Sequence, residues 1–88
     1  MNLDELKAKI ATTKWQDEVV IVLEYFNKLQ PISVRKYADK IDKSKTWVQT
    51  SLTIGRALKE HPDLKECRNR YEAYQEILRL NRMRDFLR

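Results

Sequence analysis

The chain has 88 residues, a formal net charge of +5, one glycine and two prolines. This length supports a single domain with one modest core, and so few turn-forming residues argue against a sheet protein and favour helices. The single cysteine, Cys67, excludes an internal disulfide framework. The densest apolar run, residues 19–23, is too short to cross a bilayer, and residues 1–5 lack the layout of a signal peptide. We therefore expect a cytoplasmic, all-α compact domain of about five helices spanning residues 1–88.

The positive charge is concentrated in the middle of the chain. Residues 1–30 hold four basic and five acidic residues, residues 31–60 hold seven and three, and residues 61–88 hold seven and five. Clustered lysine and arginine match the phosphate lattice of nucleic acid. A solvated lysine-rich surface would give the same distribution, so the charge by itself leaves both interpretations open.

Two helices are predicted before the first proline. Asn2 followed three residues later by Glu5 resembles a capping box, and the first helix is expected to end near residues 12–13, where either threonine could cap the next one. The second helix is expected over residues 14–29, and Pro31 stops it because proline disfavours helical geometry in the preceding residue. Large apolar residues recur along it at the helical period and are interpreted as core: Trp15, Val19, Val22, Leu23, Phe26 and Leu29.

Two further helices are predicted around a short polar turn. Ser33 is expected to cap a helix over residues 34–41, and Ser44 a helix that ends before His61-Pro62-Asp63. Residues 42–44 form the turn between them. Gly55 falls inside the second of these helices, where glycine costs up to about 1 kcal/mol relative to alanine. We attribute it to a close crossing with another helix.

The last helix is predicted over residues 70–87, with Asn69 and Glu72 as its capping box. A short turn over residues 63–67 precedes it. Its apolar residues form two neighbouring stripes, which is more than one helix contact requires. One stripe is expected to pack on the domain and the other on a second subunit. The predicted dimer surface consists of Tyr71, Tyr74, Ile77, Leu78, Leu80 and Phe86.

Residues 33–60 have the pattern of a helix-turn-helix. The major groove of DNA admits one α-helix, which a preceding helix braces. Ala38 supplies the small residue at the contact between the two helices, Val48 packs against it, and Ile41 closes the small core. Two positions depart from the usual pattern. Asp42 stands where glycine is common, although aspartate tolerates left-handed geometry, and Ser51 stands where an apolar residue is usual, so Leu52 and Trp47 are expected to supply that packing.

The polar face of the second helix in this unit carries the expected DNA contacts. Gln49 is suited to pair bidentately with adenine, and the first turn of the helix favours a phosphate. The alternative is that these are plain surface residues of a helical hairpin. Expected base contacts are Lys45, Thr46, Gln49, Thr50 and Thr53, and expected phosphate contacts are Arg35, Lys36, Lys43, Ser44 and Arg56.

Residues 38–49, Ala-Asp-Lys-Ile-Asp-Lys-Ser-Lys-Thr-Trp-Val-Gln, resemble the helix-turn-helix of ParB/KorB-type DNA-binding proteins. Residues 43–48 are the most specific part, and the resemblance covers about residues 32–80. It implies a helical domain that binds DNA, usually as a dimer. The larger nucleotide-binding domain of that family, with its glycine-rich motifs, has no counterpart in a chain with one glycine. We therefore expect a small stand-alone protein of the kind that phages and plasmids encode, and not a partition CTPase.

No catalytic residue, cofactor or metal site is predicted. His61 and Cys67 are the only soft metal ligands, whereas a structural zinc site usually needs four, and no glycine-rich phosphate loop is present. The expected function is a non-enzymatic regulator of transcription, replication or partition that binds double-stranded DNA as a homodimer. Two alternatives remain. One is a small phage factor that binds a host protein through its last helix. The other is an interfacial membrane helix built on Arg79, Arg82, Arg84 and Arg88 beside Leu80, Met83 and Leu87.

Overall fold

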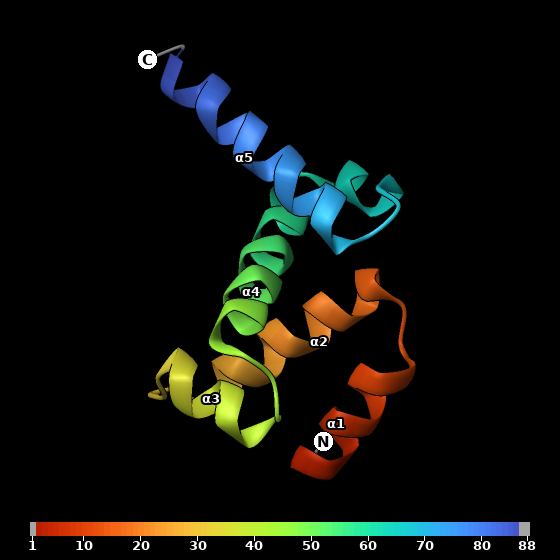
Figure 1. The fold of residues 1–88 in the computed structure, drawn as a ribbon, viewed down its shortest axis with the longest axis vertical. Helices are drawn as coiled ribbons and strands as arrows, with labels where there is room; N and C mark the ends of the chain where they lie inside the picture. Colours follow the sequence, from red (N-terminus) through yellow and green to blue (C-terminus); the bar gives the residue numbers. More distant parts are fainter. Residues whose placement is uncertain (1, 87–88) are drawn as a thin grey trace.

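A computed structural model describes residues 2–86, and for residues 85 and 86 it describes the backbone alone. This part of the chain is all-α, as predicted. Helices α2 and α3 pack against α4, α1 packs against α2, and α5 crosses the far end of α4 and projects from the body (Figure 1). The elements are α1 (Leu3–Thr12), α2 (Trp15–Lys28), α3 (Val34–Lys40), α4 (Lys45–Glu60), the 3₁₀ helix η1 (Pro62–Glu66) and α5 (Arg70–Phe86).

Four of the five α-helices begin at a side-chain cap. Each cap accepts a hydrogen bond from the backbone N–H three residues later, which satisfies one of the donors that the first turn leaves without a partner. These helices therefore begin where the sequence predicts. The caps and their N–H···O distances are Asn2 at 2.9 Å, Ser33 at 3.2 Å, Ser44 at 3.0 Å and Asn69 at 2.9 Å.

Helix α2 begins differently from the prediction. Its N-cap is Lys14, which makes no side-chain capping bond. Thr12 instead donates its hydroxyl proton to the carbonyl of Ala8 inside α1, at 3.0 Å, and Thr13 ends that helix. The start of α2 is therefore held by the packing of its apolar face, because neither threonine is placed to cap it. Of the helices described in residues 2–86, none is both long and apolar enough to cross a membrane.

The hydrophobic core consists of two clusters that share α2 and α4. The first joins α1, α2, α3 and α4, and the second joins α2, α4, η1 and α5. Because only α2 and α4 contribute to both, their contact holds the two halves of the domain together. The first cluster contains Leu6, Ile10, Val22, Leu23, Phe26, Tyr37, Ala38, Ile41, Val48 and Leu52, and the second contains Val19, Ile54, Leu58, Leu64, Ala73 and Ile77.

Tyr37 fixes the position of α3 against α2. Its side chain is fully buried, its ring lies 5.2 Å from that of Phe26 between centroids, and its hydroxyl donates to the carbonyl of Val22 at 2.8 Å. Burial, with a smaller contribution from Tyr25, raises the pKa of the Tyr37 phenol above its ordinary value. The phenol therefore keeps its proton and acts as a hydrogen-bond donor inside the core.

Gly55 lies where α4 crosses α2, as the sequence predicts. A Cβ atom at this position would be 2.9 Å from the carbonyl oxygen of Val19 and 3.2 Å from the Cβ of Leu23. Neither neighbour is the movable end of a long side chain. The absence of a side chain at Gly55 therefore permits the close contact between α2 and α4.

We predict that Gly55→Ala destabilises the protein by up to about 2 kcal/mol. Alanine gains about 1 kcal/mol of helix propensity, but the overpacking against Val19 and Leu23 costs about 1–3 kcal/mol. Urea denaturation measures the net effect, with Arg56→Ala on the exposed face of the same helix as a control that changes stability by less than about 0.5 kcal/mol. A Gly55→Ala protein more stable than the original would show that the crossing has room for a methyl group.

Candidate nucleic-acid interface

The turn between α3 and α4 has the geometry that usually selects glycine. Asp42 adopts a φ of 57°, in the left-handed region. The N–H of Lys43 donates to the carbonyl of Ala38 at 3.0 Å, and the N–H of Asp42 donates to that of Asp39 at 3.4 Å. These two bonds form a Schellman motif, which ends α3 and satisfies its last carbonyls. The chain then turns, and α4 begins afresh at Lys45.

The two helices that flank this turn pack through the three residues singled out in the sequence. Ala38 and Ile41 are each 2% exposed, and Val48 is fully buried. All three belong to the first core cluster. The carboxylate of Asp42, at the turn itself, also forms a 3.0 Å ion pair with Lys7 of α1. The turn is therefore held on its inner side by packing and on its outer side by the ion pair with α1.

The side of α4 away from the core carries the polar residues expected to contact bases. Lys45, Thr46 and Gln49 are exposed, while Thr50 and Thr53 are half-buried. The hydroxyl of Thr53 donates to the carbonyl of Gln49 at 2.8 Å, so only its methyl group and oxygen lone pairs are presented outward. The expected phosphate ligands are all exposed as well, on α3, in the turn and on α4: Arg35, Lys36, Lys43, Ser44 and Arg56.

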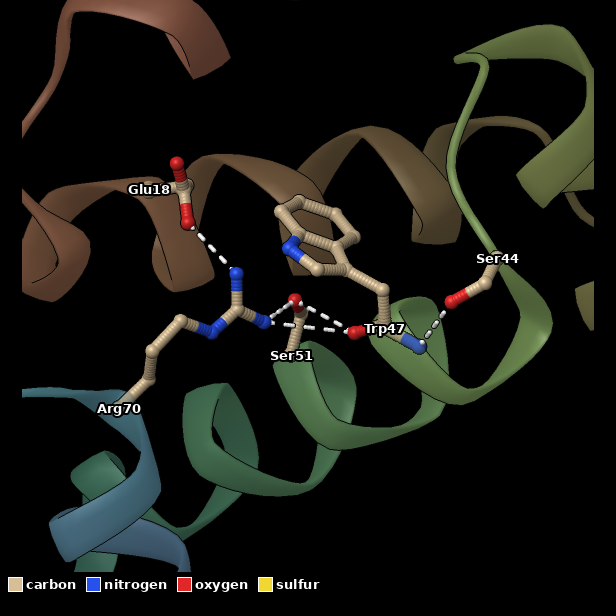
Figure 2. Close-up of polar contacts among 5 residues, drawn as sticks. All are labelled: Glu18, Ser44, Trp47, Ser51 and Arg70. Carbon is tan, nitrogen blue, oxygen red and sulfur yellow. Dashed lines mark hydrogen bonds and ion pairs between the residues drawn. The ribbon is translucent and has the colours of Figure 1, made fainter.

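Leu52 belongs to the first core cluster and Trp47 packs against it, as expected, whereas Ser51 makes polar contacts. It is fully buried, its hydroxyl donates to the carbonyl of Trp47 at 2.9 Å, and it accepts a hydrogen bond from the guanidinium of Arg70. Figure 2 shows Arg70 reaching from α5 to Ser51 and Trp47 on α4 and to Glu18 on α2. The short side chain of Ser51 leaves room for this guanidinium, which an apolar residue would exclude.

Arg70 makes polar contacts with both α2 and α4. It donates to the carboxylate of Glu18 at 2.7 Å and to the carbonyl of Trp47 at 3.3 Å. Its guanidinium carbon also lies 4.2 Å from the centroid of the Trp47 ring, and Lys43 Nζ lies 5.0 Å from the same ring. Such cation–π contacts orient an indole. Trp47 is therefore held by a cation from α5 and a cation from the turn.

Burial dominates the electrostatics of the Arg70–Glu18 pair. The side chains are 21% and 12% exposed. Burial raises the pKa of the Glu18 carboxyl, with Arg70 opposing that shift, and burial lowers the pKa of Arg70, with Glu18 opposing it. Because desolvation outweighs attraction on both partners, the pair contributes a defined geometry more than net stability.

The predicted dimer surface divides between the core and the solvent. Tyr71 is 71% exposed and Leu78 is 36% exposed, whereas Tyr74 and Leu80 are half-buried. Ile77 differs from the expectation because it is 5% exposed and packs in the second core cluster. It follows Ala73 at the four-residue spacing that places both on the inner side of α5. The side chain of Phe86 lies outside the described residues.

Among the described residues, no three His, Cys, Asp or Glu side chains gather closely enough to hold a metal ion. Cys67 is half-buried. Burial, and then the carboxylates of Glu72, Glu76 and Asp63, raise the pKa of its thiol. A raised pKa keeps the thiol protonated and therefore weakly nucleophilic.

Comparisons of the chain with protein-family models, with curated proteins and with solved structures found no match. The resemblance of residues 32–80 to ParB/KorB-type proteins therefore stays a prediction made from the sequence. Inferences about function depend on the arrangement of the side chains themselves.

We predict that Glu18→Gln changes the pH dependence of stability. Because the pKa of Glu18 is raised on folding, its stabilising contribution is complete below the unfolded value of 4.5 and is lost as pH rises through the folded value. The original protein should thus lose stability relative to Glu18→Gln between about pH 4 and about pH 7. Urea denaturation of both proteins at the two pH values measures this. A constant difference would mean that the attraction of Arg70 balances burial, and a change in the opposite sense would mean that the attraction outweighs it.

Proposed function

We propose that the protein is a non-enzymatic DNA-binding protein that places α4 in the major groove. The observation that carries this proposal is the face of α4 that the core leaves free. It begins directly after the turn at Asp42 and presents Lys45, Thr46 and Gln49 to solvent. An α-helix with its side chains is about 10–12 Å across, and the major groove is about 12 Å wide. A free polar helix face braced by a second helix meets that requirement.

The charge around this face supports the proposal. Residues 31–60 carry seven basic and three acidic residues. Asp42, in the turn, is paired with Lys7 and so is partly neutralised. Arg35 and Lys36 on α3 and Lys43 in the turn are exposed, so each can neutralise a phosphate and release a counterion. Phosphate contacts of this kind fix the position of the protein on the duplex, and base contacts then select the sequence.

The resemblance to ParB/KorB-type proteins supports a role as a small regulator of transcription, replication or partition. It also supports binding as a homodimer. Two copies related by a two-fold axis would select a palindromic site with half-sites about one helical turn apart. Selection from random duplex DNA identifies the bound sequence and shows whether that sequence is two-fold symmetric.

The projecting part of α5 favours a second candidate function, a protein-interaction module. Leu78 is 36% exposed and Met83 is 48% exposed, and exposed apolar side chains that form a contiguous patch mark interaction sites. The partner would be a second copy or a host protein. Light scattering of the free protein distinguishes a dimer from a monomer.

We predict that Gln49→Ala weakens binding to the selected site by about 1–3 kcal/mol. The loss should be confined to one base pair per half-site, because the glutamine amide matches the donor and acceptor of a single adenine. Titration of the original duplex and of duplexes changed at each position measures it. Equal affinities of the Gln49→Ala and original proteins for the selected site would remove Gln49 from the base contacts.

We predict that Arg35→Ala weakens binding to every duplex alike and lowers the slope of log K against log salt by about 1. The physical reason is the loss of one phosphate contact without loss of a base contact. Lys9→Ala, on the exposed side of α1, removes the same charge and should leave the slope unchanged. If the original protein binds no duplex at low salt, the proposed function is wrong.

A further inference from the structure

A groove of about 350 Å³ lies between α4 and the first two turns of α5, and it is called here the α4–α5 groove. It adjoins the free face of α4, because Thr50 belongs to both. Tyr71 is 71% exposed, and Gln75 is also exposed. The groove is therefore open to a ligand that also covers α4. Its lining residues are Trp47, Thr50, Arg70, Tyr71, Tyr74 and Gln75.

The acidic side chains in the first half of α5 lie on one side of the helix. Glu72 and Glu76 lie near Cys67, because their carboxylates raise the pKa of its thiol. Glu76 is also paired with Arg79. Residues 71, 75, 78 and 82 recur at three- and four-residue spacing and so share the other side of the helix. Over residues 71–82 that side carries Tyr, Gln, Leu and Arg and no carboxylate.

The floor of the α4–α5 groove is also free of uncompensated negative charge. Among the described residues, the one carboxylate paired with a lining residue is that of Glu18, which lies 2.7 Å from Arg70. Lys43 lies 5.0 Å from the Trp47 ring, at the end of the groove nearest the turn. Aromatic rings, neutral donors and nearby cations, with the acids on the far side, suit the backbone of a nucleic acid.

We infer that the α4–α5 groove receives the sugar–phosphate backbone of one DNA strand bordering the major groove. The hydroxyl of Tyr71 and the amide of Gln75 donate hydrogen bonds to its phosphates, and the tyrosine ring packs on deoxyribose. This inference rests on the proposed function. A helix that fills the major groove has a strand on each flank. The basic residues of α3 and of the turn bind the backbone of one strand, and α5 binds the backbone of the other.

The test uses the full chain and the duplex selected from random DNA. Tyr71→Ala and Gln75→Ala should each weaken binding about three- to tenfold, the size of one or two neutral hydrogen bonds. The salt slope should not change, because no charge is removed. Tyr71→Phe keeps the ring and isolates the hydroxyl. Asn81→Ala, at an exposed neutral residue of α5 outside the α4–α5 groove, is the matched control and should bind like the original protein.

Phosphate-ethylation interference then locates the contact. In the original protein, ethylation of phosphates on one strand beside the Gln49 base pair should block binding. Tyr71→Phe should lose that block, whereas Gln49→Ala should retain it. Thermal unfolding confirms that each variant is folded.

Three outcomes overturn the inference in distinguishable ways. If Tyr71→Ala and Gln75→Ala bind like the original protein while Gln49→Ala binds weakly, the groove is not a DNA contact, although the proposed function stands. If the original protein binds no duplex, both fail together. If Tyr71→Ala converts a dimer to a monomer in light scattering and keeps the ethylation pattern, a second copy of the chain occupies the groove instead of DNA.

Discussion

The contact between α2 and α4 at Gly55 is the constraint on which the rest of the fold depends. Helix α4 packs against α2, α3, η1 and α5, and it is one of only two elements that contribute to both core clusters. A Cβ at Gly55 would lie 2.9 Å from the Val19 carbonyl oxygen, so the two helices approach more closely than an alanine at this position would allow without a shift. This crossing decides which side of α4 is buried, and therefore which polar residues remain free to bind a ligand.

The two positions that depart from a usual helix-turn-helix pattern have different physical explanations. Asp42 occupies a left-handed conformation that ends α3, so here aspartate performs the role that glycine commonly performs. Ser51 is buried and is bonded to Arg70, so its departure reflects a polar contact with another helix. The first could be anticipated from the tolerance of aspartate for positive φ. The second depends on a residue 19 positions away.

Arg70 links the scaffold, the free face of α4 and the last helix. It bonds to Glu18 on α2, to Ser51 and Trp47 on α4, and stacks on the Trp47 ring. The same interaction brings the first turns of α5 beside Thr50 and so forms one wall of the α4–α5 groove. A buried ion pair of limited net stability can thus determine the shape of a surface groove.

The sequence by itself determined the helices, the capped starts of α1, α3, α4 and α5, and most of the core. These depend on signals within three or four residues: serine and asparagine caps, apolar residues at the helical period, and a proline or left-handed residue that ends a helix. It also identified the polar side of α4 and predicted that Gly55 lies at a close helix crossing. Only the tertiary structure decided that Ile77 lies in the core and not on a dimer surface, that Ser51 meets Arg70, and that α5 forms a groove beside α4. The physical reason is separation along the sequence. Arg70 and Glu18 are 52 positions apart, and only the packing of whole helices brings such residues into contact.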